Sequence, residues 1–112
     1  MPKDDYIIVL NTCNSTDIAS LIADTLVSQK LAACVNMING VESVYQWQGK
    51  IERDKEILLI IKTKRALFSQ IEQTIQELHD YELPEIIAVP IETGEKSYLN
   101  WIQSATLATE IK

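Results

Sequence analysis

The sequence is poor in the residues that most catalytic and metal sites use. It has a single histidine, His79, and two cysteines, Cys13 and Cys34, in 112 residues. It contains no GxSxG nucleophile elbow, P-loop, CxxC pair, HExxH helix or EF-hand loop. Because the chain has only one histidine, most triad and acid–base schemes lose their usual base. We therefore expect a protein that is not an enzyme.

Other absences limit its location and partners. No apolar run approaches the length needed to span a bilayer, and the acidic start MPKDD is unlike a signal peptide. These features predict a cytoplasmic protein with no membrane partner. A net charge of −6 argues against a nucleic-acid partner. Two cysteines are too few for a disulfide scaffold, so both are expected to be free thiols in a single domain covering residues 1–112.

The most informative stretch, residues 31–63, is predicted to be a long hairpin. Gly49 takes positive φ at no steric cost, so a two-residue turn is expected at Gln48-Gly49. After the turn, the apolar run Ile57–Ile61 is typical of a central strand covered on both faces. The strand over residues 50–63 would span roughly 46 Å, whereas a globule of this size is about 34 Å across. We interpret the overhang of about 10 Å as an oligomer contact.

The rest of the chain predicts two strands and three helices. Apolar runs predict strands over residues 6–10 and 86–91, and Ser15 or Thr16 is expected to cap the first helix. Helical apolar faces are formed by Ile18, Leu21, Ile22, Leu26, then Phe68, Ile71, Ile75, Leu78, then Tyr98, Trp101, Ile102 and Ala105. The order predicts an α+β, ferredoxin-like βαββαβ sandwich with an extra C-terminal helix. Its first and third strands lie in the centre of the sheet.

Several polar and aromatic residues are candidates for a ligand site, each with a simpler structural alternative. His79, Tyr81 and Glu85 form a polar loop that could meet a small ligand, or that only ends a helix. Cys13 precedes a helix N-terminus, where a thiolate is stabilised, or is a small loop residue. Tyr45 and Trp47 could stack on a planar ligand or fill a subunit contact. Glu56 and Lys62 flank the apolar run and either face a cleft or are solvated strand ends.

Three segments occur in order: CVNMINGVESVYQWQGKIERDKEILLIIKT, HDYELPEIIAVPI and SYLNWI. They resemble the CutA family of divalent-cation tolerance proteins over nearly the whole chain. The resemblance implies a homotrimer of ferredoxin-like subunits, similar in architecture to PII signalling proteins, with clefts between subunits. Some members bind copper through a cysteine and two adjacent histidines. The matching positions here are Asn11, Leu78 and His79, so only His79 is retained, and Cys13 is a candidate substitute.

Two hypotheses for function follow from the residues and the resemblance. The first is a trimeric CutA-type protein in the response to divalent metal ions such as copper. The alternative is a PII-like sensor or carrier that binds small molecules in the intersubunit clefts, without strong metal binding. In the second case the trimer is expected to gather one set of side chains from adjacent subunits: Tyr45, Glu56, Lys62, His79, Tyr81, Glu85 and Trp101.

Overall fold

The computed structural model describes residues 5–108. The elements follow the predicted order, and the first strand is longer than expected. They are β1 (Tyr6–Cys13), α1 (Thr16–Ser28), β2 (Cys34–Trp47), β3 (Lys50–Lys64), the short 3-10 helix η1 (Arg65–Leu67), α2 (Phe68–Leu78), β4 (Ile87–Pro90) and α3 (Lys96–Ala105). β1 continues three residues beyond the predicted strand end at Leu10, into the stretch expected to be a loop.

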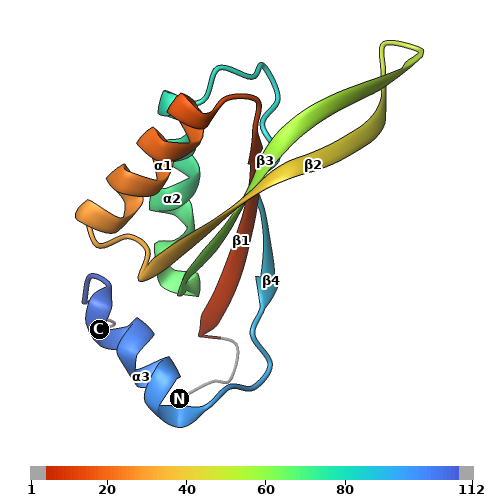
Figure 1. The fold of residues 1–112 in the computed structure, drawn as a ribbon. Coiled ribbons are helices and arrows are strands. Elements are labelled where there is room, and N and C mark those ends of the chain that lie inside the picture. The colour runs from red at the N-terminus through yellow and green to blue at the C-terminus, as the bar shows by residue number, and fades with distance from the viewer. Residues whose placement is uncertain (1–4, 109–112) are drawn as a thin grey trace.

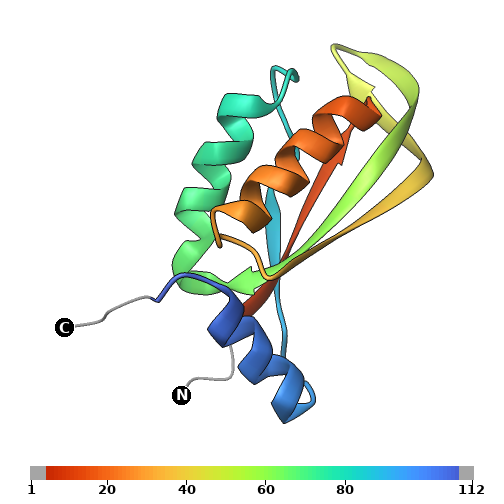
Figure 2. The same ribbon diagram turned by 60° about the vertical axis from the view of Figure 1, so that its left-hand side comes forward.

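The four strands form one antiparallel sheet in the order β2-β3-β1-β4, which confirms the predicted topology. In the central pair, Val9 lies opposite Ile61, and Ala88 of β4 lies on the other side of Val9. Helices α1 and α2 cover one face of this sheet, and α3 lies near its lower end (Figures 1 and 2). The arrangement is ferredoxin-like, with Ser15 capping α1 as expected by accepting a hydrogen bond from the Ile18 amide.

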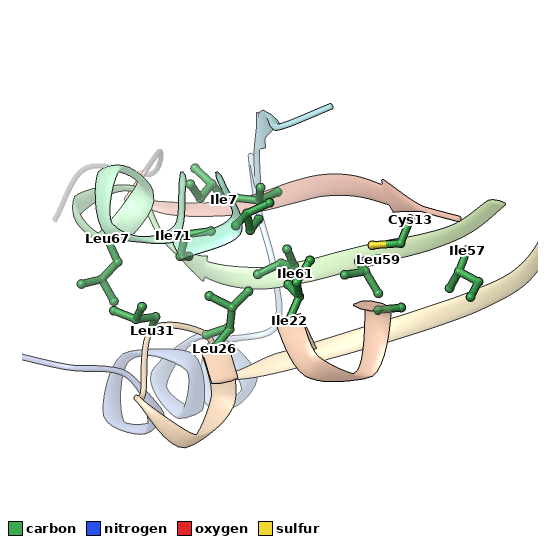
Figure 3. Packing of buried hydrophobic residues seen from close by; sticks show 14 residues of the cluster. Ile7, Cys13, Ile22, Leu26, Leu31, Ile57, Leu59, Ile61, Leu67 and Ile71 are labelled. Carbon is green, nitrogen blue, oxygen red and sulfur yellow. The ribbon is translucent and has the colours of Figure 1, made fainter. Parts of the chain in front are cut away.

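The core lies between the sheet and the two covering helices (Figure 3). Alternate residues of β1 and β3 point into it because successive side chains of a strand face opposite ways. The fully buried members include Ile7, Val9, Leu59, Ile61, Ile22, Leu26, Ile71 and Ile75. The prediction that Ile57–Ile61 is covered on both faces is wrong for the single chain, since Leu58 and Ile60 remain partly exposed. Leu21 is also 45% exposed, because it lies on the outer side of α1.

The long hairpin closes as predicted and then leaves the body of the molecule. Gln48 and Gly49 have φ of 52° and 82°, the positive pair that a type I′ turn requires. A register shift between Ile38 and Val41 places two residues of β2 opposite one of β3, with Gly40 at φ 76°. Such a bulge bends and twists the strand. The hairpin therefore projects (Figure 1), and the molecule measures 46 × 26 × 25 Å.

The closing helix α3 is less buried than its apolar pattern predicts. Ile102 is its buried residue, whereas Tyr98 and Trp101 are 42% and 43% exposed. Their rings contact each other, with centroids 5.4 Å apart. The aromatic pair therefore does not contribute to the core of the single chain, and it forms part of the surface at the end of the sheet opposite the hairpin tip (Figure 1).

Candidate functional site

A groove of about 840 Å³ lies between the projecting hairpin and the loop that follows α2. We call it the hairpin groove. It is lined by residues 43–47 and 54–56 of the hairpin, by residues 80–83 and 85 of the loop, by Thr12 near the end of β1, and by Asn14 just after it. The bulge at Gly40 helps to form the groove because it directs the outer part of the hairpin away from the sheet.

Three hydrogen bonds hold the loop that forms one wall of the groove. The side-chain amide of the buried Asn11 donates from Nδ2 to the Glu85 carbonyl at 2.8 Å. His79 Nε2 lies 2.7 Å from the Thr12 carbonyl oxygen, and the Tyr81 hydroxyl donates to Glu56 Oε2 at 2.6 Å. Two of these bonds reach β1 and the third reaches β3, so the loop is fixed to the central strands of the sheet.

His79 uses both ring nitrogens in this arrangement. The Thr12 carbonyl can only accept a hydrogen bond, so His79 Nε2 carries the proton. The second nitrogen, Nδ1, accepts a hydrogen bond from the Tyr81 amide at 3.1 Å. This assigns the neutral Nε2–H tautomer, in a side chain with no exposed surface. A metal ion could coordinate His79 only after one of these hydrogen bonds breaks, so the structure gives this histidine a role in positioning the loop.

Two tyrosines of the groove donate hydrogen bonds to carboxylates of β3. Tyr81 bonds Glu56, and both burial and this hydrogen bond to a carboxylate raise the pKa of the Tyr81 phenol. Tyr45 bonds Asp54, and this hydrogen bond raises the pKa of Tyr45 to about 12. Because Asp54 and Glu56 are two residues apart in a strand, they face the same way. That spacing is the sequence signal that could have added Asp54 to the predicted set.

The charge of the groove is strongly negative. Its lining includes five carboxylates and a single lysine, Lys55; the carboxylates are Asp54, Glu56, Asp80, Glu82 and Glu85. Four of them are exposed, whereas Glu56 is only 8% exposed. Within residues 5–108, no group of three or more His, Cys, Asp or Glu side chains is arranged to hold a metal ion. The carboxylates are therefore spread along the groove and do not converge on one point.

Cys13 is also unsuited to coordination in this state. It faces the core beside Ile57 and has no exposed surface (Figure 3). Its thiol lies 3.4 Å from Asn11 Oδ1, to which it donates a weak hydrogen bond. Burial, followed by the charges of Asp80 and Glu56, raises the pKa of Cys13 to about 11. The thiol is therefore protonated near neutral pH, whereas a metal ligand must be a thiolate.

The predicted site residues fall into two groups. Tyr45, Glu56, Tyr81 and Glu85 line the hairpin groove, and His79 lies buried behind its loop. Lys62 and Trp101 lie elsewhere. Lys62 pairs with Ile8 and Cys34, six residues along β3 from Glu56, which corresponds to roughly 20 Å. A single chain therefore does not bring all seven residues together.

Lys62 belongs to a second cluster at the α3 end of the sheet. Its Nζ lies 6.0 Å from the centre of the Tyr98 ring, at the outer limit of a cation–π contact. Tyr98 in turn contacts Trp101. We call Lys62, Tyr98 and Trp101 the α3 cluster. The prediction named Lys62 and Trp101 but missed Tyr98, whose position in the apolar pattern of α3 suggested a core residue.

Comparisons with known proteins agree with this architecture. The family model described as CutA1 divalent ion tolerance protein matches residues 7–105. The chain is 42% identical to the divalent-cation tolerance protein CutA of Thermus thermophilus, covering 88% of this chain and 96% of that protein. The crystal structure of CutA1 from Oryza sativa superimposes with a TM-score of 0.91 at 39% identity, covering 96% of this chain and 98% of that chain.

The fold defines a ferredoxin-like α+β protein with a long projecting hairpin. By the match over residues 7–105 and the identity to its relatives, the chain belongs to the CutA1 divalent ion tolerance family. It spans nearly all of the Thermus thermophilus relative but only 55% of the chloroplastic CutA protein of Arabidopsis thaliana. A solved relative from Archaeoglobus fulgidus is described as periplasmic. Among the described residues, no helix is long and apolar enough to cross a membrane.

Proposed function

We propose that this protein acts in the tolerance of divalent cations, in the cytoplasm, as a homotrimer without enzymatic activity. The observation that carries the proposal is the family match over residues 7–105, together with 42% identity to a relative named for divalent-cation tolerance. Deleting the gene should lower growth in added divalent metal salts, and a deletion strain with unchanged growth would contradict the role.

The trimer is supported by the face of the sheet that the helices leave uncovered. Register places Ile8, Leu10, Leu58 and Ile60 together on this face. We call it the open face. These residues are only partly buried, and their neighbours on the edge strands are more exposed: Ile38 is 44%, Ile87 51% and Val89 47% exposed. An apolar sheet face of this extent is normally covered by another layer, and the family resemblance makes two further copies of the chain the proposed cover.

Light scattering of the wild-type protein at low micromolar concentration tests the trimer. The expected mass is three times that of the chain, and a monomer mass would contradict the proposal. Ile60→Asp places a charge on the open face and should lower the mass, since a buried unpaired charge is unfavourable. Leu21→Asp is the matched control: Leu21 is 45% exposed on α1, so the trimer should persist.

For copper, we propose weak binding that does not use cysteine. Cys13 is buried and protonated near neutral pH, and both nitrogens of His79 are occupied by hydrogen bonds. Calorimetric titration with Cu²⁺ is expected to give the same weak affinity for wild type and Cys13→Ser. A nanomolar affinity that disappears in Cys13→Ser would contradict this, whereas loss of weak binding in Glu56→Gln would support coordination by carboxylates.

The alternative function is a PII-like carrier or sensor of small molecules, and the division of the predicted residues into two groups favours it. The hairpin groove and the α3 cluster lie at opposite ends of the sheet, and they have opposite charge. In a cyclic trimer each interface joins two different surfaces, so one copy could place its α3 cluster against the groove of the next. A thermal-shift screen tests this. A ligand that stabilises wild type but not Tyr81→Ala, in a variant that still forms trimers, would support the alternative.

A further inference from the structure

The closing helix α3 is joined to the rest of the chain by few contacts. It lies apart from the layer that α1 and α2 form (Figures 1 and 2). Ile102 is the buried residue of the helix. The cap of its first turn is local, since the Glu95 carboxylate accepts a hydrogen bond from the Tyr98 amide. Residues 92–94, which lead into the helix, are exposed and belong to no helix or strand. The helix is therefore built to move as a unit.

Two hydrogen bonds hold the C-terminal end of α3. The Leu107 amide donates to the Lys30 carbonyl at 2.9 Å, and Lys64 Nζ donates to the Leu107 carbonyl at 2.7 Å. We call Lys30, Lys64 and Leu107 the α3 latch. Lys64 is the last residue of β3 and is only 3% exposed. The latch thus joins the end of the helix to β3 and to the turn after α1, through a buried ammonium group.

The closed latch leaves polar groups poorly satisfied. An ammonium group has three N–H donors, whereas Lys64 donates to one neutral carbonyl and forms no ion pair within residues 5–108. Burial lowers the pKa of Lys64, because its charged form has lost water. The helix itself carries a second such group, since Gln103 Oε1 is buried and accepts no hydrogen bond from the described part of the chain. Both groups would regain water if the helix left the sheet, which favours opening.

We propose that α3 is a lid that opens while the rest of the fold stays intact, and that the buried ammonium group of Lys64 makes it easier to open. Ile102 and the α3 latch hold the closed state. A buried charge with one neutral partner is commonly less favourable than an apolar side chain of similar size. Lys64 therefore weakens the closed state overall, although it donates a hydrogen bond there.

The lid controls whether the α3 cluster exists. Tyr98 and Trp101 move with the helix, whereas Lys62 stays on β3. The three side chains are together only when the lid is closed, so opening separates the aromatic pair from the lysine. This inference does not depend on divalent-cation tolerance, and its test can fail separately.

Amide hydrogen exchange of the full chain, at one fixed protein concentration, tests the lid. In the wild type, α3 amides should exchange roughly tenfold or more faster than those of α1, which has four buried residues. Lys64→Met removes the charge and keeps an unbranched side chain, so α3 exchange should slow by roughly fivefold or more. Gln103→Leu removes the second unsatisfied group and should act in the same direction. Lys30→Met is the matched control, because its side chain is exposed and its carbonyl still accepts from Leu107.

A separate lid predicts one more result. Leu59→Ala weakens the core and should speed exchange in α1, while α3 exchange stays as in the wild type because the lid opens with the core folded. Equal exchange of α3 and α1 in the wild type would overturn the proposal, since the helix would then open only with the whole chain. Faster α3 exchange in Lys64→Met would overturn it too, because Lys64 would then be a clamp. Unchanged α3 exchange in both Lys64→Met and Gln103→Leu would show that other contacts, such as those of a neighbouring copy, set the opening, and would also overturn it.

Discussion

The two halves of the long hairpin are held in place by different forces. The proximal half, residues 34–38 and 57–64, lies on the helices, and its inward residues Leu59 and Ile61 have no exposed surface. The distal half, residues 41–56, projects beyond the bulge, and Val44 and Ile51 there are 52% and 75% exposed. The proximal half is fixed by apolar burial against its own chain. The distal half depends on its turn and on cross-strand pairs, which leaves its surface free to form the groove.

The largest expected difference between the halves is in unfolding free energy. Leu59→Ala leaves a cavity in the core beneath the helices and should lower the stability by about 3 kcal/mol. Arg53→Ala removes the exposed distal ion pair with Glu42 and should cost at most about 0.5 kcal/mol. Urea unfolding at one fixed protein concentration measures both. Equal losses would contradict the comparison, because they would show that the distal half contributes as much as the core.

The turn is expected to have the next largest effect, and it acts on the distal half. Gly49→Ala places a β-carbon at φ 82°, which should cost about 1 kcal/mol although the site has open space around it. Gln48 also has positive φ, at 52°, so Gln48→Asn should stabilise the hairpin by a few tenths of a kcal/mol. The same urea titrations measure both changes. If Gly49→Ala leaves the unfolding free energy unchanged, the turn does not hold the distal half in place.

The structure of the proximal half and of the turn could be predicted from the sequence. The apolar run at Ile57–Ile61 and the glycine at position 49 are local signals, and both led to the strand order and hairpin that the structure shows. Length arithmetic also predicted the overhang, since the long axis is 46 Å against 26 and 25 Å for the others. These features follow from strand geometry and glycine conformation, which depend on few neighbours.

The candidate site was less predictable because its contacts are distant in sequence. The Nε2 nitrogen of His79 forms a hydrogen bond with the carbonyl of Thr12, which is 67 residues away in the sequence. No local sequence pattern reveals that partner. Cys13 was expected in a loop, but β1 continues to it and strand alternation turns it into the core. Lys62 and Glu56 share a strand face by parity, yet their six-residue separation places them at opposite ends of the sheet. The number of residues between them on β3 was enough to predict that the two side chains lie too far apart to share one site in a single chain.

Cys13 of β1 lies opposite Ile57, where the proximal and distal halves of the hairpin meet. Its thiol is expected to make the unfolding free energy depend on pH. Burial raises the pKa of Cys13 from 9.0 to about 11 in the folded protein. Between these values the unfolded thiol ionises while the folded thiol stays protonated, so stability falls as pH rises through that window. The loss should be on the order of 1 kcal/mol. Urea unfolding from pH 8 to 11 should show a shallower decline for Cys13→Ala, and parallel slopes would contradict this assignment.

The smallest expected effect is spectroscopic and confined to the distal half. The Tyr45 hydroxyl donates to Asp54, and this bond, with nearby carboxylate charges, raises the pKa of Tyr45 to about 12. Asp54→Asn removes the charge, so the Tyr45 phenol should ionise at lower pH. Tyrosinate absorbance followed against pH, with Tyr45→Phe to assign the signal, measures the shift. Because Tyr45 is 40% exposed, the substitution should leave the fold intact, and the titration then reports only the distal surface. If the titration midpoint of Tyr45 is unchanged in Asp54→Asn, Asp54 does not form a lasting hydrogen bond with the Tyr45 hydroxyl. The wall of the groove would then be less ordered than the proximal half.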